Sequence, residues 1–445
     1  SSYLENPGSL FGHLLLRIDA KEGIFSPLML NTTLNYGAIV PQNENPFAYI
    51  YNGIFGNYKS QFSDERFHMF DNMYGEKELR DMWEYNLNLS DDQKKRIVYH
   101  AWELIHGVQF DYYFFKENCA YRIAELIDMG WENNKILNKN KLWSSPIEVL
   151  LKLSNTKIND KPILYEEPEL LMSRLTKLNH RIKYVSKQEK YIINHLYNDY
   201  KYIDNVNYKE LNDNKKSLIL DVYFDYIQIY PKTKDKENES KKYKLLNHRS
   251  KLPKSKKIKY PVLTSPTNGH GPHRVKFGFF KNKINNLEGI LAFRLSYHDF
   301  LDSDHGHITD STLKTFDIEL ISNENIISLD KFVFVEMIKL PSNKTGLDMD
   351  DSYSWSFVFE WRDKDLECVA CKILHLNYGL GNSFYFNRNL AYVLIKVFFD
   401  IPELHTKKIT LGLKPTLGVI LKPIPKLKLN YQYMIEEKLF GKNKS

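Results

Sequence analysis

The stretch "DYYFFKENCAYRIAELI" (residues 111–127) joins an aromatic run to an amphipathic helical pattern. Apolar residues recur at the spacing of one helical face (Ala120, Ile123, Ala124 and Ile127). This pattern predicts a helix that begins near Cys119. The positive end of a helix and its free N–H groups lower the pKa of a thiol and can receive an oxyanion. Cys119 is therefore either a nucleophile or, as free cysteines often are, a buried small residue.

The sequence before this stretch predicts a small antiparallel sheet followed by helices. Three strand-like segments are separated by Gly, Pro and Asn: "GHLLLRID" (12–19), "LMLNTTLNYGAIV" (28–40) and "FAYIYNGIFG" (47–56). The apolar residues of "EKELRDMWEYNLNL" (76–89) have helical spacing. Ser90, followed by acidic residues, predicts the start of a further helix that ends at Gly107.

The C-terminal part alternates apolar and polar residues. In "SYSWSFVFEW" (352–361) the aromatic residues fall on one strand face and the small or charged residues on the other. The same alternation occurs in "ILAFRLSYHD" (290–299) and "LKLNYQY" (427–433). Such strands build either a membrane β-barrel or half-barrel, which turns its apolar face to lipid, or a soluble sandwich, which buries that face. Because aromatics make up 14% of the chain, we favour the barrel or half-barrel.

Together these patterns predict an α+β protein with four regions. We expect a catalytic domain at residues 1–145, a helical accessory region at 146–204, a basic Lys/Asn-rich linker or loop at 205–265 and a β-rich domain at 266–445.

The charge and cysteine content exclude several classes of protein. The formal net charge is +7, but much of the excess lies in "KTKDKENESKKYK" (232–244) and "HRSKLPKSKKIKY" (248–260). Such a tract is a solvated loop or a contact for anionic headgroups, and without a nucleic-acid-binding motif it does not predict a nucleic-acid partner. Three cysteines do not make a disulfide framework, and the lone CxxC of Cys368 and Cys371 is more typical of a structural than a redox role.

Cysteine acyl chemistry requires an imidazole beside the thiol and a polar group that orients the imidazole. Among the 14 histidines, His13 is the best partner for Cys119, because it opens a predicted strand at a sheet edge that a helix N-terminus can face. Asn35, on the next predicted strand, is placed to bond the distal nitrogen of His13, although Asn is also common in turns.

Five histidines with several aspartates form a second group of polar residues at the start of the β-rich domain (His270, His273, His298, His305 and His307). Such a group can bind a metal, but loops of this composition are more often turns. We therefore assign no metal ligand and no cofactor from the sequence.

The ordered motifs resemble the Lnb N-terminal periplasmic domain family. The resemblance covers about residues 9–130 and rests on five motifs: "SLFGHLLLRID", "LNYGAI", "YNGIFGNY", "ELRDMWEYNLNL" and "AWELIHGVQFDYYFFKENCAYRIAELID". The family is similar to circularly permuted papain-like acyltransferases and amidases, in which the histidine precedes the cysteine. The resemblance implies that Cys119 is the nucleophile and His13 the general base.

Four more residues in or beside these motifs are candidates for substrate binding or support: Arg17, Tyr36, Asn118 and Arg122. Arg122 lies one helical turn after Cys119, where it can favour the thiolate, hold an acidic group of a substrate, or form a salt bridge with Glu117 or Glu125. Arg17 lies on the same face of its strand as His13 and has the same structural alternative.

The resemblance implies cysteine-dependent acyl transfer or hydrolysis in the periplasm or at the outer membrane of a Gram-negative bacterium, with lipoprotein N-acylation as one form. The expected partners are an acyl lipid, a lipoprotein or a peptide, and the outer membrane. Two alternatives remain open. One is a peptidoglycan or protein amidase with the same catalytic groups, and the other is a non-catalytic outer-membrane assembly or binding protein.

Overall fold

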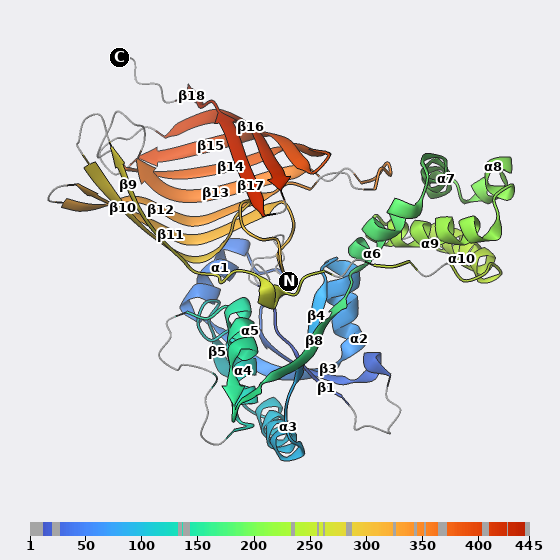
Figure 1. Cartoon of the computed structure of the whole chain (residues 1–445), viewed down its shortest axis with the longest axis horizontal. Coiled ribbons are helices and arrows are strands. Elements are labelled where there is room, and N and C mark those ends of the chain that lie inside the picture. Colours follow the sequence, from blue (N-terminus) through green and yellow to red (C-terminus); the bar gives the residue numbers. More distant parts are fainter. Residues whose placement is uncertain are drawn as a thin grey trace. The chain divides into compact units, whose positions relative to one another are not determined.

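The computed structural model divides the chain into two compact units. It describes residues 12–19, 27–131, 136, 143–232, 236–255, 258–260, 263–281, 287–323, 326–341, 345–350, 353–363, 372–402, 409–424 and 426–440. Unit 1 contains the described residues as far as Ser265 together with those of Asn343–Asp351, and unit 2 contains the rest. The expected α+β class is confirmed, with helices in the N-terminal half and a large antiparallel sheet in the C-terminal part (Figure 1).

A four-stranded antiparallel sheet organises the first part of unit 1. Its strand order is β1-β2-β3-β5. The strands are β1 (Leu16–Ile18), β2 (Thr32–Ala38), β3 (Tyr58–Arg66) and β5 (Phe110–Tyr112). The helices of this part are α1 (Pro46–Phe55), α2 (Phe67–Phe70), α3 (Asp91–Ile105), α4 (Cys119–Asp128) and α5 (Pro146–Asn155), with the 3-10 turn η2 (Leu28–Leu30) and the π-helix η3 (Asp71–Lys77). The buried face of α4 packs against β2 and completes one hydrophobic core with the sheet.

Two expected elements have the other secondary structure. Residues 47–56, expected as a strand, form α1, because Pro46 suits the first turn of a helix and Tyr49 packs on the Phe114 ring at 5.1 Å. The segment 76–89, expected as a helix, contains β4 (Met82–Leu87), which pairs with β8 (Leu164–Leu171). In β4 every residue is partly buried, so no period of two marks it as a strand.

The second part of unit 1 is a helical cluster with its own core. It consists of α6 (Arg174–Arg181), η4 (Ile182–Tyr184), α7 (Lys187–Asn198), η5 (Tyr200–Asp204), α8 (Val206–Lys209), α9 (Asp213–Ile229) and α10 (Lys236–Ser250). The short strands β6 (Lys157–Ile158) and β7 (Lys161–Pro162) precede it in the chain. With β8 they interrupt the region 146–204, which was expected to be helical. The stretch 205–265, expected as a linker or loop, thus contains two long helices, since apolar residues of α9 are buried between its charges.

Unit 2 is built on one antiparallel sheet of ten strands. The strands are β9 (Arg274–Lys281), β10 (Leu287–His298), β11 (Ser311–Asn323), β12 (Ile326–Lys339), β13 (Ser354–Asp363), β14 (Lys372–Phe386), β15 (Asn389–Pro402), β16 (Thr410–Ile424), β17 (Leu427–Met434) and β18 (Glu437–Phe440), after the 3-10 turn η6 (Pro266–Asn268). Within the described residues the order runs linearly from β17 to β9, with β18 paired to β16. The sheet is therefore open. Of the expected forms it is nearest to the half-barrel, not to a closed barrel or a sandwich.

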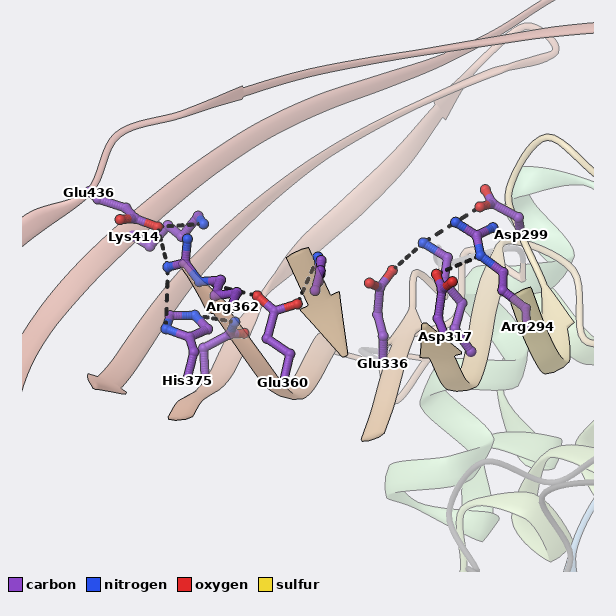
Figure 2. A network of polar contacts seen from close by, with 12 residues as sticks. Arg294, Asp299, Asp317, Glu336, Glu360, Arg362, His375, Lys414 and Glu436 are labelled. Atoms are coloured by element: carbon purple, nitrogen blue, oxygen red, sulfur yellow. Dashed lines mark hydrogen bonds and ion pairs between the residues drawn. The ribbon is translucent and has the colours of Figure 1, made fainter. Parts of the chain in front are cut away.

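The aromatic face of this sheet is the more exposed one. In β13 the residues Trp355, Phe357, Phe359 and Trp361 are partly exposed, whereas the alternate serines, Val358 and Glu360 are buried. Strand β15 repeats the pattern, with exposed Val397 and Phe399 beside buried Lys396 and Asp400. The buried face carries a network of ion pairs from β10 to β16 and residue Glu436 (Figure 2). The same buried face also holds an apolar cluster (Phe300, Ile338, Leu340, Leu390, Tyr392, Leu394 and Ile420). The buried face is therefore mixed and the exposed face apolar, whereas a soluble sheet exposes its polar face.

The segment 345–350 supplies a core side chain to the helical cluster of unit 1. Leu347 is completely buried in the core formed by α6, α7 and α9. The backbone N–H of Met349 donates to the Tyr226 hydroxyl at 2.7 Å, and the Tyr230 hydroxyl donates to Asp350 at 2.9 Å. The packing of α7 and α9 thus depends on a segment more than a hundred residues away in sequence.

We predict that Leu347→Ala destabilises the helical cluster by about 2–4 kcal/mol, because it removes a buried side chain and leaves a cavity. Hydrogen exchange of α7 and α9 measures this loss as faster exchange of their amides. The control is Met349→Ala, which truncates a half-exposed side chain of the same segment and keeps its backbone hydrogen bond. Unchanged protection in Leu347→Ala would contradict the packing described.

Candidate active site

Asn118 fixes the start of the α4 helix. Its side-chain oxygen accepts hydrogen bonds from the backbone N–H groups of Ala120 at 3.1 Å and Tyr121 at 3.2 Å. Its amide nitrogen donates to the carbonyl oxygens of Phe114 at 3.1 Å and Ser144 at 2.7 Å. All four bonds are made by a buried side chain, so Asn118 holds the loop before α4 and the helix start as one rigid piece.

The thiol of Cys119 is buried at the first position of α4, as the sequence predicts for this helix start. Burial raises the pKa of the thiol, but His13 and hydrogen bonds from the backbone N–H groups of Leu14 and Ala120 lower it. The net pKa of Cys119 lies below its ordinary value. The site therefore favours a thiolate, which is the nucleophilic form of cysteine.

His13 lies just before β1 and faces Cys119. Burial lowers the pKa of its imidazole, whereas the charge of the Cys119 sulfur and hydrogen bonds to Cys119 and Asn35 raise it, and the net pKa is above the ordinary value. The Nε2 atom of His13 lies 2.7 Å from the side-chain oxygen of Asn35. With Nε2 bonded to Asn35, Nδ1 is the ring nitrogen left to exchange a proton with the thiol.

The strand β2 determines where Asn35 points. Its neighbours Leu34 and Tyr36 are buried in the core, so alternation turns Asn35 to the other face. Asn35 pairs with Ser63 of β3 in the sheet register, and its amide nitrogen donates to the Ser63 hydroxyl at 3.5 Å. That bond directs the oxygen of Asn35 toward His13, where it accepts the proton of Nε2.

Two tyrosines that the sequence analysis did not single out also lie beside the thiol. Tyr112 of β5 is buried, and this burial together with the charge of the Cys119 sulfur raises the pKa of its hydroxyl well above the ordinary value. A hydrogen bond from the backbone N–H of Cys119 acts in the opposite direction and lowers this pKa. The Tyr74 ring lies 5.9 Å from the His13 ring, and burial raises its pKa to about 12. Both hydroxyls stay protonated at neutral pH and can donate hydrogen bonds. Only the position of Tyr112 in the aromatic run before Cys119 hinted at such a role.

The backbone conformation after η3 places the buried Arg80 near His13 and Tyr74. Leu79 has a φ of 56°, a left-handed conformation that is uncommon for a leucine. The guanidinium of the next residue, Arg80, lies over the Tyr74 ring at 4.1 Å and within 2.8 Å of Glu78. A π-helix and a strained residue in succession are features that cluster at functional sites.

The two arginines expected as supporting residues are both held by carboxylates. Arg17 bonds Asp19 at 2.6 Å and Glu84 at 2.7 Å. Arg122 bonds Glu125 at 2.7 Å and lies over the Phe110 ring at 4.2 Å.

Arg122 also pairs with Glu117, and together they make a charged cluster around the buried Tyr36. Tyr36 itself is fully buried, and its hydroxyl is hydrogen-bonded to Ser60 at 2.5 Å. These side chains lie in the framework around the Cys119 helix. The expected CxxC of Cys368 and Cys371 lies outside the described residues.

Two family models match separate parts of the chain. Residues 1–155 match the Lnb N-terminal periplasmic domain. This match confirms the resemblance found in the sequence motifs and indicates a periplasmic role and location.

Residues 263–445 match a second model, Domain of unknown function (DUF7840). No curated protein and no solved structure matches the chain. Among the described residues, no helix is both long enough and apolar enough to cross a membrane.

We predict that iodoacetamide alkylates Cys119 with a rate that rises with pH around an inflection below that of an ordinary thiol, since thiolate forms as pH passes the lowered pKa. His13→Ala removes the positive charge that offsets the effect of burial on the pKa of Cys119. The inflection therefore moves to higher pH, and the alkylation rate at neutral pH falls about tenfold or more. Mass spectrometry of the Cys119 peptide measures the rate. His100→Ala, on exposed α3, is the control, and identical pH profiles for both variants would refute the pairing.

Proposed function

We propose that this chain is a cysteine-dependent enzyme of the periplasm that moves an acyl group through a thioester on Cys119. The observation that carries the proposal is the pairing of Cys119 with His13, in which the pKa of the thiol is lowered and the pKa of the imidazole is raised. Asn35 supplies the orienting oxygen at 2.7 Å. Nucleophile, base and orienting group are the three parts that cysteine acyl chemistry requires.

The first half of the reaction forms the acyl-enzyme. The Cys119 thiolate attacks the carbonyl carbon of an ester or amide, and the carbonyl electrons move to its oxygen. When the tetrahedral intermediate collapses, the bond to the leaving alcohol or amine breaks, and the imidazolium of His13 gives its proton to that group. The product is a thioester of Cys119 and a neutral His13.

The second half releases the acyl group. Neutral His13 takes a proton from an incoming amine or water as that group attacks the thioester, and the thiolate leaves with the proton retained on His13. Attack by an amine gives N-acylation, as in lipoprotein modification, whereas attack by water gives hydrolysis. The catalytic residues are the same in both cases, so the acceptor decides between them.

A donor beside Cys119 is suited to the oxyanion of both tetrahedral intermediates. Asn118 already occupies the N–H groups of Ala120 and Tyr121. The N–H of Cys119 donates to the Tyr112 oxygen, which places the Tyr112 hydroxyl next to the sulfur and leaves its own proton to donate. A preorganised donor at this place stabilises the developing negative charge.

The thioester gives a direct test of the acyl-transfer proposal. Incubation of the full chain with phospholipid vesicles should add one acyl mass to the Cys119 peptide, and hydroxylamine should remove it, because a thioester is cleaved by this nucleophile. His13→Ala should reduce the adduct by about 100-fold or more. His106→Ala, on the exposed end of α3, serves as the control. An adduct that persists in Cys119→Ser, or none in the unmodified chain with any ester donor, would refute acyl transfer.

We also propose that unit 2 contacts the hydrocarbon of the outer membrane through its exposed sheet face. Phe277 and Phe279 of β9 are 77% and 79% exposed, and the exposed side chains continue through β14, β15 and β17. The charges instead lie on the buried face, as Arg294 with Asp317 illustrates (Figure 2). The pair of His375 and Asp400 is a second example. Lipid-facing strands have this distribution, with apolar residues outward and polar residues inward.

We predict that the full chain floats with phosphatidylethanolamine–phosphatidylglycerol vesicles in a density gradient. Phe277→Lys combined with Val397→Lys should reduce the floating fraction at least tenfold, because a lysine on a lipid-facing surface costs roughly 2–4 kcal/mol. The matched control is Tyr243→Lys, which changes a side chain of similar exposure on α10. Equal flotation of the two variants would show that this face does not meet lipid.

A further inference from the structure

Three of the five histidines near the start of unit 2 come together in the structure. His270 follows η6, His298 ends β10, and His307 lies in the connection from β10 to β11. One ring nitrogen from each lies within 4.8 Å of the others. The three rings are nearly parallel, and the centroids of His298 and His307 are 4.0 Å apart.

The two remaining histidines of this region are engaged by backbone. The Nδ1 atom of His273 lies 2.5 Å from the carbonyl oxygen of Leu295. The Nδ1 atom of His305 lies 3.3 Å from the carbonyl oxygen of Asn268. The structure therefore distinguishes three clustered imidazoles from two that are hydrogen-bonded to backbone carbonyl groups. The spacing of the five histidines in the sequence does not make this distinction.

The hydrogen bonds fix the tautomer of His270. Its Nδ1 atom lies 2.8 Å from the carbonyl oxygen of Gly271, which can only accept, so Nδ1 carries the proton. The Nε2 atom of His270 consequently presents a lone pair. This lone pair points to Nδ1 of His298, at 3.2 Å.

Neither neutral tautomer of His298 satisfies its surroundings. If Nδ1 carries the proton, the buried Nε2 atom presents a lone pair without a hydrogen-bond partner among the described residues, 3.9 Å from a carboxylate oxygen of Asp304. If Nε2 carries the proton, this N–H faces the carboxylate of Asp304. In that tautomer the lone pair of His298 Nδ1 faces the lone pair of His270 Nε2. A cation bound to both lone pairs resolves the second arrangement.

We propose that His270, His298 and His307 bind a transition-metal ion of the Zn²⁺ class. Imidazole nitrogens are preferred ligands of this class, and about 3.3 Å separates two nitrogens on a tetrahedral zinc with bonds of about 2.0–2.1 Å. The 3.2 Å between His270 and His298 fits that separation. Three protein ligands leave a fourth position for water.

The surrounding contacts are those of outer ligands that orient a metal site. The carbonyl of Gly271 orients His270, and the carboxylate of Asp304 faces the Nε2 atom of His298. Lys428 of β17 donates to the other carboxylate oxygen of Asp304 at 3.1 Å, which holds that side chain in place. Carboxylate–histidine–metal arrangements of this kind raise affinity by fixing the ring orientation. The metal would join the segment after η6, the end of β10 and the connection to β11.

Zinc binding by the full chain tests the site. After treatment with a chelator and dialysis, the chain should take up about one Zn²⁺, measured by elemental analysis and by titration calorimetry. His270→Ala and His307→Ala, which change partly exposed side chains, should weaken zinc binding by more than about 100-fold. Asp304→Asn should weaken it by about 10–100-fold, as expected for a residue that acts through His298.

The control is His305→Gln, which lies two residues from His307 but outside the cluster, and it should bind zinc as the unmodified chain does. Co²⁺ provides a second readout, because tetrahedral coordination by nitrogen gives visible absorption that both alanine variants should lose. Circular dichroism establishes that the variants are folded. The proposal is overturned if the unmodified chain takes up no zinc, or if His305→Gln loses as much affinity as His307→Ala.

Discussion

A buried thiol with a lowered pKa is the constraint on which the first part of unit 1 depends. Burial alone would keep Cys119 neutral and inert, so its lowered pKa requires groups that compensate the loss of water. His13 brings the opposite charge from before β1, and the backbone of Leu14 brings an N–H group from the same segment. The segment before β1 and the start of α4 must therefore both reach the sulfur of Cys119, and the four hydrogen bonds of Asn118 hold the helix start in place.

The sequence allowed part of this site to be predicted for a physical reason. Cys119 was singled out because a helix start follows local rules of capping and apolar spacing, and His13 because it opens a predicted strand and lies in the first of the ordered family motifs. Asn35 was singled out because it lies on the next predicted strand. Tyr74 and Arg80 could not be found in this way. They reach the site through a π-helix and a left-handed residue at Leu79, and neither feature has a periodic sequence signal.

The errors in secondary structure have a common origin in tertiary packing. The aromatic residues of α1 favour a strand by their intrinsic β-propensity. In the structure Tyr49 of this helix packs on the Phe114 ring, and this tertiary contact outweighs the propensity. The strands of unit 2 were predictable because alternation is a local property of each strand. Alternation alone does not say which face is exposed. The aromatic content favoured an outward aromatic face, which agrees with the exposed side chains, and the ion pairs across neighbouring strands lie on the other face.

Histidine has three different environments in this chain, and each follows from what its nitrogens meet. His13 faces a thiolate and an amide oxygen, so it is favoured as a cation and can move protons. His375 meets the Asp400 carboxylate at 2.6 Å on the buried face of the sheet, within a network of ion pairs. When Nε2 of His298 carries the proton, the lone pairs of His298 Nδ1 and His270 Nε2 face each other. An electron-pair acceptor such as a metal ion suits this geometry. Position relative to carboxylates and other imidazoles, more than residue type, thus separates structural pairing from the proton transfer and the metal ligation that we propose.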